Sequence, residues 1–340
     1  MKHILEVVVV FALFESYILA GPIAVPVEIM KVDIQQFLKN KGSSITGQRE
    51  QIIQLITIVG ETKHSVIWKG NFSDRTRKNI QIAIKITMDQ GCYDREIEIY
   101  KALNATSDPN IEQYGIPRIY YHGSLLEKYR VIAMTLFDGT LEDLYKKKGN
   151  ISPDLSVLII FKQAVKILAH IHNVGEILHN DIKPANIFLK DLKVFIGDFD
   201  YATLDFGQTI GHSPIFASKN FYNSKNRYPM DDLESLCYSM WYVTGVPMVR
   251  TLENDAESEG CMLSRCTTNA AKKERMMQKC QHYKNKSVKK AFEFICADQV
   301  ICGGICIDYN RVLKELDDAL GHVDHSVKLN WLTGASSSRH

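Results

Sequence analysis

The stretch HNDIKPANIFLKDLKVFIGDFD, residues 179–200, is the feature that most restricts what this chain can fold into. Within it, four polar side chains follow one another in a fixed order: Asp181, Lys183, Asn186 and Asp198. An ordinary polar hairpin loop does not require such an ordered set, and a motif with several fixed points is far more specific than any single match. The stretch therefore predicts a chemical site built on a short loop and a hairpin.

These residue types suit the transfer of a phosphoryl group from ATP, which needs cations, metal ligands and a carboxylate near the acceptor hydroxyl. Asp181 is the candidate to orient that hydroxyl and accept its proton. Lys183 would offset charge on the γ-phosphate, and Asn186 and Asp198 supply oxygen ligands for Mg²⁺ or Mn²⁺. The motif thus favours an enzyme that uses ATP and a divalent metal.

The sequence up to residue 135 predicts a small β-rich lobe, and the rest of the chain is predicted to be mostly helical. Residues 80–87, IQIAIKIT, alternate like a strand and contain Lys85, which can hold the α and β phosphates. Glu96 lies in a segment with helical spacing and can pair with that lysine. Alone, such residues are more often solvated surface groups. With five expected strands and one helix before residue 136, the pattern predicts an α+β fold.

At this point the chain resembles a eukaryotic protein kinase, and more closely the casein kinase 1 group. The kinase motifs are VGETKHSVIWKG, IAIK, HNDIKPAN and DFD, and the group motifs are EIEIYKAL, FDGTLEDLY, FASKN, DDLESL and DYNRVLKEL. The resemblance covers residues 48–320. It implies a bilobal kinase fold with a five-stranded antiparallel N-lobe, one helix beside it and a mainly helical C-lobe. It also implies a monomeric enzyme that phosphorylates serine or threonine in proteins.

The same resemblance assigns roles to further positions. Met134 would guard the back of the adenine pocket, and residues 135–137 would form the hinge that binds adenine. Thr135 and Phe137 are the ends of that hinge, Gly60 would belong to the phosphate roof, and the walls around the base would be Ile67, Ala83 and Phe188. In the C-lobe, His179 would be the structural histidine of the catalytic loop, Asp232 would brace that loop, and Ser213 would lie in the loop before the acceptor site. Apolar residues at such positions would be core residues in almost any fold.

Four positions depart from the kinase pattern. Thr62 and Ser65 replace the second and third glycines of the roof, which predicts weaker ATP binding. Asn180 replaces the arginine that usually meets an activation-loop phosphate, so activity is expected not to be switched that way. Asp200 replaces a glycine; if that site needs positive φ, the cost is about 1–2 kcal/mol. Ile215 replaces an arginine, which weakens the case for already phosphorylated substrates.

The first twenty residues predict a secretory signal peptide, because a basic start and the apolar run VVVVFALF precede a small residue, Ala20. The run is too short to span a bilayer, and a buried N-terminal strand is the alternative. Residues 21–47 are interpreted as a leader with one short helix, residues 48–322 as the kinase domain with lobes 48–135 and 136–322, and residues 323–340 as a flexible tail. A net charge of +2 gives no indication of nucleic-acid binding.

The cysteines fit an oxidising compartment. Six of the eight cysteines lie between residues 261 and 306, which favours disulfides there, with zinc as the alternative. Four glycosylation sequons, at Asn71, Asn104, Asn150 and Asn285, are compatible with secretion. A lysine-rich run, residues 272–290, would either recruit acidic partners or form a solvated surface. Three hypotheses remain: a secreted kinase, a secreted pseudokinase that only binds, and an intracellular kinase with a hydrophobic leader.

Overall fold

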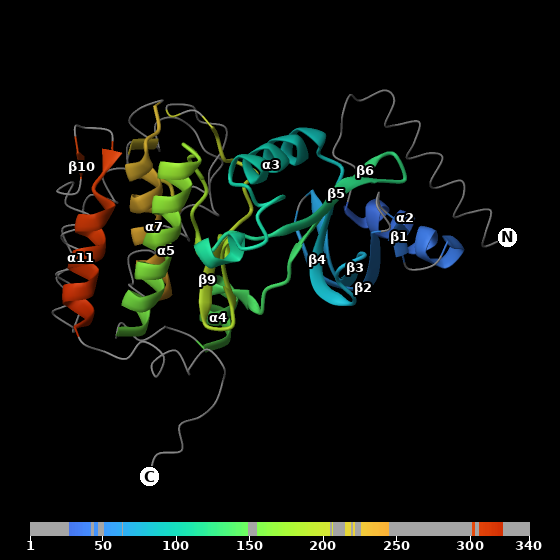
Figure 1. Ribbon diagram of the computed structural model, residues 1–340, viewed down its shortest axis with the longest axis horizontal. Coiled ribbons are helices and arrows are strands. Elements are labelled where there is room, and N and C mark those ends of the chain that lie inside the picture. Colours follow the sequence, from blue (N-terminus) through green and yellow to red (C-terminus); the bar gives the residue numbers. More distant parts are fainter. Residues whose placement is uncertain are drawn as a thin grey trace, which may run out of the picture. The chain divides into compact units, whose positions relative to one another are not determined.

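A computed structural model describes residues 27–41, 44–46, 51–62, 64–148, 155–204, 206, 215–218, 220–221, 226–244, 301–302 and 306–321. These residues form two compact units. The first contains the described residues up to Gln90 and also Tyr121–Met134. The second contains Gly91–Tyr120 and the described residues from Thr135 onward (Figure 1). The signal peptide, Ser213, the lysine-rich run and the tail that the sequence predicts lie outside the described residues.

The first unit is built on a six-stranded sheet in the order β1-β2-β3-β4-β6-β5. Its strands are β1 Ser44–Thr46, β2 Ile52–Glu61, β3 Ser65–Ser73, β4 Ile80–Thr87, β5 Ile119–Leu125 and β6 Tyr129–Thr135. The pairs β1–β2, β2–β3 and β3–β4 are antiparallel. The sequence predicts five of these strands; β1 is the addition, and it lies in the segment expected to be a leader. Alternating isoleucines explain why these segments are strands with one buried face.

The core of this unit lies on one face of the sheet. Val66, Trp68 and Phe72 of β3 are buried there, as are the alternating isoleucines Ile82 and Ile84 of β4. Helix α2, Val27–Lys41, adds two buried side chains spaced four residues apart, Met30 and Ile34. This helix is longer than the short helix that the sequence predicts near residue 34, and it belongs to the hydrophobic core.

The second unit is mainly helical. Its helices are α3 Gln90–Ala102, η2 Ile111–Tyr114, α4 Leu141–Lys148, α5 Leu155–Val174, η3 Pro184–Asn186, α7 Pro229–Val243 and α11 Tyr309–Leu320. Short strands β7 Gly139–Thr140, β8 Ile187–Lys190 and β9 Lys193–Ile196 form a small sheet, and β10 Ile301–Cys302 pairs with β11 Cys306–Ile307. An antiparallel sheet in one unit and helices in the other confirm the expected α+β kinase fold.

Helix α5 is the centre of the second unit and packs against α7, α11 and β9 (Figure 1). By length and composition, part of it, Ser156–Val174, is apolar enough to cross a membrane. However, most of that segment is buried against its neighbours, as expected for the core helix of a folded domain. The loop that follows α5 carries the polar motif from which the sequence analysis began.

Candidate active site

The residues expected to handle nucleotide in the first unit share one face of its sheet. The strand register pairs Gly60 with Ile67, Ile67 with Lys85, and Lys69 with Ala83. Directly opposed residues of antiparallel strands point to the same face, so these side chains lie opposite the buried isoleucine face. Lys85 is only 6% exposed. The sheet therefore presents a largely buried lysine beside small and apolar side chains, a suitable surface for a base and its phosphates.

The backbone amides of the turn between β2 and β3 form hydrogen bonds within the turn itself. The N–H groups of His64 and Ser65 donate to Thr62 Oγ1 at 3.3 and 3.1 Å, and Thr62 N–H donates to Ser65 O at 2.8 Å. Hydroxyl residues often close turns in this way. Both amides lie in the segment that the sequence predicts to be the phosphate roof. In this conformation the Thr62 hydroxyl accepts from both of them, which adds a physical reason for weak phosphate binding.

In the second unit, Asp181 is the best-defined polar group of the loop after α5. It is 3% exposed, and its Oδ2 accepts hydrogen bonds from Lys183 Nζ at 2.7 Å and Asn186 Nδ2 at 3.2 Å. Its Oδ1 is buried and has no hydrogen-bond partner within the part of the chain that the structure describes. A buried acceptor without a partner is costly, so a donor from a bound molecule would be favourable at Oδ1.

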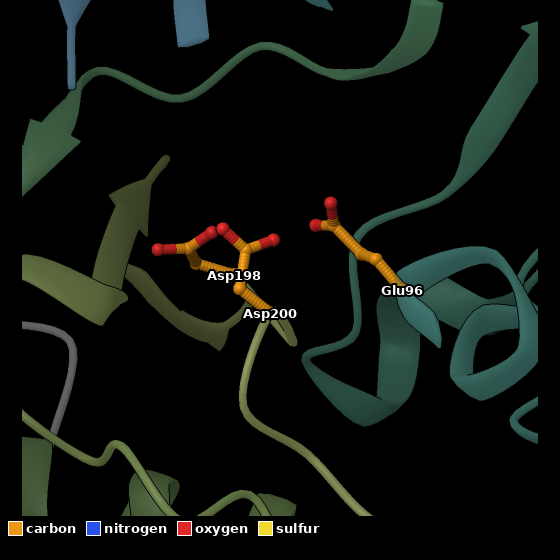
Figure 2. Close-up of side chains that lie close together, drawn as sticks. All are labelled: Glu96, Asp198 and Asp200. Carbon is orange, nitrogen blue, oxygen red and sulfur yellow. The ribbon is translucent and has the colours of Figure 1, made fainter. Parts of the chain in front are cut away.

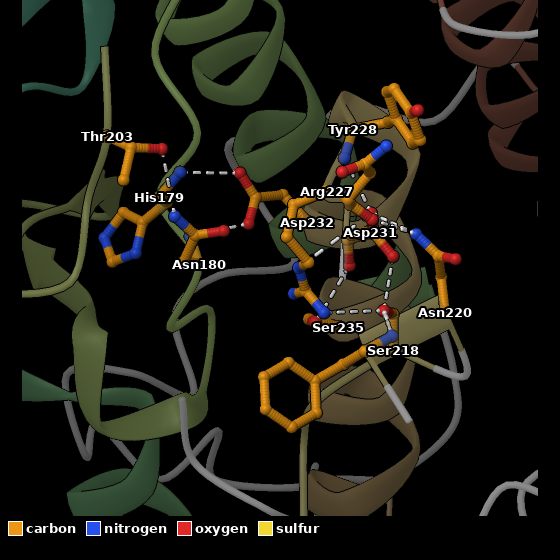
Figure 3. Close-up of polar contacts among 12 residues, drawn as sticks. His179, Asn180, Thr203, Ser218, Asn220, Arg227, Tyr228, Asp231, Asp232 and Ser235 are labelled. Carbon is orange, nitrogen blue, oxygen red and sulfur yellow. Dashed lines mark hydrogen bonds and ion pairs between the residues drawn. The ribbon is translucent and has the colours of Figure 1, made fainter. Parts of the chain in front are cut away.

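The loop is fixed by one carboxylate on α7. Asp232 accepts from the backbone N–H groups of His179 at 2.7 Å and Asn180 at 2.9 Å (Figure 3). His172 on α5 also contacts it. Burial alone would raise the pKa of Asp232, but the hydrogen bond and charge of His172 and the His179 amide outweigh burial and lower that pKa. Asp232 therefore stays ionised and holds the loop backbone.

Two aspartates that follow β9 lie close to a glutamate of α3. The carboxylates of Glu96, Asp198 and Asp200 have oxygens within 4.8 Å of one another (Figure 2). Asp198 has a left-handed φ of 64°, which aspartate tolerates better than most residues. Among the described residues, Asp200 is not one of those with positive φ. The condition for a backbone cost at Asp200 is therefore not met, because the left-handed conformation falls on Asp198.

The donor set fits a divalent metal. Both hydrogen bonds from Asn186 to Asp181 use the amide nitrogen, so the amide oxygen is left as a possible metal ligand. Oxygen ligands of this kind suit Mg²⁺ and Mn²⁺. The three clustered carboxylates also repel one another unless a cation lies among them. Asp198 and Asn186 are thus the residues that would hold the metal, with Asp200 and Glu96 close enough to influence it.

The implied adenine-binding residues fall in both units. Met134 is the second-to-last residue of β6 and is half-buried. Thr135 is 1% exposed; its N–H donates to Arg118 O, and its hydroxyl accepts from Arg118 N–H at 2.9 Å. In the second unit the Phe137 ring stacks on Phe188 with centroids 4.8 Å apart. The structure therefore brings Phe137, the last hinge residue, into contact with Phe188, one of the wall residues. The Thr135 amide is used in the hydrogen bond to Arg118 O.

The FASKN segment is anchored to α7 by a buried polar cluster. Ser218 donates to the Asp231 carboxylate and accepts from Arg227 Nη1 at 3.0 Å (Figure 3). Asn220 Nδ2 donates to the same carboxylate at 3.2 Å. Ile215, half-buried, precedes this anchor. Sequence reasoning did not identify Asp231 and Arg227 as the anchor, although an aspartate at the start of a helix is a common capping signal.

Five further contacts were missed because their signals are weak in sequence. Asn180 Nδ2 donates to Tyr201 O at 3.1 Å and Thr203 Oγ1 at 3.3 Å. Arg95 Nη1 donates to Asp200 O at 2.7 Å. The buried Phe199 ring packs between His179 and Tyr100, with centroids 4.9 and 5.2 Å apart. The contacts involve backbone carbonyls, a hydroxyl and rings, and their partners are distant in the sequence or have no fixed residue type.

An α+β fold with a buried aspartate, a buried asparagine and a half-buried lysine on one loop, and a second aspartate nearby in the chain, is the arrangement expected of the protein kinase fold. Comparison with known proteins agrees: the sequence pattern of the protein kinase domain matches residues 49–243. The chain belongs to the protein kinase domain family.

Two relatives illustrate how far the similarity extends. A solved structure of vaccinia related kinase 3 superposes with a TM-score of 0.64 and 15% identity, covering 86% of this chain and 95% of that chain. At that identity the likeness shows the fold alone. Eukaryotic translation initiation factor 2-alpha kinase 1 of Mus musculus is 29% identical over 115 residues, which is 31% of this chain and 18% of that protein. The chain therefore matches less than a fifth of that relative's length.

Proposed function

We propose that this chain is a serine/threonine protein kinase of the casein kinase 1 type, which transfers the γ-phosphate of ATP to protein hydroxyl groups. One observation carries the proposal: Asp181 has one carboxylate oxygen held by Lys183 and Asn186, and the other buried without a partner among the described residues. A general base needs such a fixed carboxylate with one accepting atom left for the substrate. The casein kinase 1 assignment rests on LEDLY and DDLESL.

Each residue of the loop has a distinct part in this reaction. Asp181 Oδ1 accepts the hydrogen bond of the acceptor hydroxyl and takes its proton while that oxygen bonds to the γ-phosphorus and ADP is released. Lys183, 2.7 Å from Oδ2, places a cation beside the developing charge. When bound, ATP and a divalent metal supply the phosphoryl group and neutralise its charge. Asp232 keeps the loop backbone in place throughout.

The test is phosphate transfer by the whole protein. The full chain is expressed in secreting eukaryotic cells, and transfer from ATP to itself or to casein is measured with Mg²⁺ and with Mn²⁺. Asp181→Asn is expected to lower kcat by about 10²–10⁴-fold. Asp318→Asn makes the same chemical change on an exposed residue of α11 and is expected to leave kcat unchanged. Equal rates for wild type and Asp181→Asn would reject the kinase proposal.

A pseudokinase is the second candidate, and two observations favour it. The Thr62 hydroxyl occupies the turn amides, and Asp200 adds a carboxylate beside the metal ligands. Both features oppose the binding of a polyanion such as ATP. Nucleotide binding by wild type without transfer above the Asp181→Asn level would support this candidate, which would then act as a binding protein on a kinase scaffold.

We also propose that the protein is secreted. The proposal is supported by the basic and apolar start of the chain, by the clustered cysteines and by the sequons. Asn104 is exposed and lies in a turn with φ of 58°, so its side chain is accessible to modification. A mature N-terminus at Gly21 and sugar on Asn104 are the expected results. An intact Met1 on unglycosylated protein inside the cell would instead favour an intracellular kinase.

A further inference from the structure

One hydrogen bond joins helix α3 directly to the segment that carries the metal-binding aspartate. Arg95 Nη1 donates to the backbone oxygen of Asp200 at 2.7 Å. Both residues belong to the second unit. Asp200 lies two residues after Asp198, so this bond fixes the backbone close to a metal ligand. A hydrogen bond from a charged donor is shorter and stronger than a neutral one.

Two other residues of α3, Glu96 and Tyr100, also approach residues 198–200. Their interactions are less favourable or less directional than the Arg95 hydrogen bond. The Glu96 side chain points toward those of Asp198 and Asp200 (Figure 2). One oxygen of each of the three carboxylates lies within 4.8 Å of the others, and like charges repel. Tyr100 packs edge-on against Phe199, with an interplanar angle of 84°. The contact between the Tyr100 and Phe199 rings allows α3 to slide along the segment, and the repulsion between Glu96 and the two aspartates pushes α3 away from it. The Arg95 bond offsets that repulsion and gives the contact a defined register.

The other side of the segment is held by the catalytic loop. Asn180 Nδ2 donates to Tyr201 O, and it also donates to Thr203 Oγ1 (Figure 3). The backbones of Leu178 and Thr203 exchange two hydrogen bonds of 2.9 Å. Asn180 has a φ of 63°, a conformation in which asparagine is among the most tolerated residues. The segment of residues 200–203 is thus held between α3 and the catalytic loop by contacts that require no phosphate.

We propose that Arg95 is a positioning residue for the metal site, because its bond to Asp200 O holds residues 198–203 against α3. Arg95 and Asn180 together hold this segment without the phosphate that orders it in kinases activated by phosphorylation. This inference rests on the proposed kinase function for its effect on activity. Its structural part, the ordering of residues 198–203, is independent of activity. Arg95 acts through Asp198 and touches neither nucleotide nor acceptor.

The test compares Arg95→Ala, Arg95→Lys and Lys101→Ala in the full-length protein. Lys101 is an exposed cation on the same helix, so its removal controls for loss of charge. Amide hydrogen exchange is measured at Ala202 and Thr203, whose N–H groups donate to Phe199 O and Leu178 O. Arg95→Ala is expected to speed exchange there about tenfold, the effect of losing one charged hydrogen bond, while Lys101→Ala does not.

The kinetic readout is the Mg²⁺ or Mn²⁺ concentration needed for half-maximal rate. Arg95→Ala is expected to raise it and to lower kcat about tenfold, with the KM for protein substrate unchanged. Arg95→Lys, which can still donate to one carbonyl, should recover most of both losses. Unchanged exchange at Ala202 and Thr203 in Arg95→Ala overturns the inference. If wild type transfers no phosphate, the kinase proposal fails, while the exchange comparison still decides the role of Arg95.

Discussion

The ring of His172 lies 3.0 Å from the carboxylate of Asp232, and each side chain is only 1% exposed. The second ring nitrogen of His172 contacts the hydroxyl of Tyr309 on α11. Burial and then the charge of Asp232 raise the pKa of Tyr309, so this hydroxyl keeps its proton and can donate. Helices α5, α7 and α11 are therefore joined by one polar chain that ends on the backbone of the catalytic loop.

The hydrogen bonds that join Tyr309, His172 and Asp232 predict that the fold is sensitive to acid. The pKa of Asp232 is lower in the folded protein than in the unfolded protein, so its contribution to stability is complete above about pH 4 and is lost as pH falls through the folded pKa. Asp232→Asn removes the charge, and its amide cannot accept all three hydrogen bonds. We expect a loss of about 3 kcal/mol in the free energy of unfolding at pH 7.

Thermal unfolding between pH 7 and pH 2 checks this expectation. The wild type should lose more stability than Asp232→Asn on acidification, so the two curves should converge. Asp318→Asn, an exposed aspartate on α11, serves as the control and should follow the wild type. Parallel curves for wild type and Asp232→Asn would show that Asp232 is not the source of the acid sensitivity.

The turn at Thr62 gives a prediction in the opposite direction, a gain of function. Thr62→Gly removes the hydroxyl that accepts from the His64 and Ser65 amides. Both amides then become available to a phosphate, so we expect the KM for ATP to fall about two- to fivefold. Thr76→Gly is the matched control, because Thr76 lies in the neighbouring turn and contacts Asp74. An unchanged or higher KM in Thr62→Gly would contradict this interpretation of the turn.

The sequence predicted those parts of the protein that depend on residue type and spacing. Strand alternation placed Lys85 on the face opposite the buried isoleucines, and the order of Asp181 and Asn186 placed both on one loop. Helix α2 was underestimated because only two fully buried residues, Met30 and Ile34, mark its inner face. Two well-buried side chains give too weak a periodicity to set the length of a helix.

Other features could not be predicted because backbone atoms form them. Arg95 donates to the carbonyl oxygen of Asp200, and every residue has such an oxygen, so no residue type indicates the contact. The left-handed conformation fell on Asp198 rather than Asp200 for a related reason: aspartate accepts this conformation at either position, and the surrounding chain decides which one adopts it. Local turn chemistry at Thr62, by contrast, was within reach of sequence rules.

The cysteines provide a prediction that does not depend on activity. Within the part of the chain that the structure describes, Cys92 and Cys237 form no disulfide; the first is half-buried and the second is buried. The expected disulfides lie in the cluster 261–306, and the register of β10 and β11 places Cys302 opposite Cys306. Alkylation of the secreted protein without reductant should label Cys92 when folded and also Cys237 when unfolded. Reduction should then expose six more thiols; labelling of those six before reduction would contradict the disulfide proposal.

Asp200 allows charge and backbone to be separated by experiment. Its carboxylate lies within 4.8 Å of those of Asp198 and Glu96, and its φ is not in the left-handed region. Charge is then the relevant property, and a neutral side chain should relieve repulsion toward ATP as well as a glycine does. We expect Asp200→Asn and Asp200→Gly to lower the KM for ATP by a similar factor, about two- to tenfold.

The measurement is the rate of transfer with Mg²⁺ and with Mn²⁺ for wild type and both variants. Removing the third carboxylate should raise the rate with Mg²⁺ relative to Mn²⁺, because Mg²⁺ favours sites with few carboxylates. Asp191→Asn, an exposed aspartate in the turn between β8 and β9, is the control for loss of one negative charge. A gain with Asp200→Gly but none with Asp200→Asn would mean that backbone freedom at this position, and not its charge, limits how Asp198 is presented to the metal.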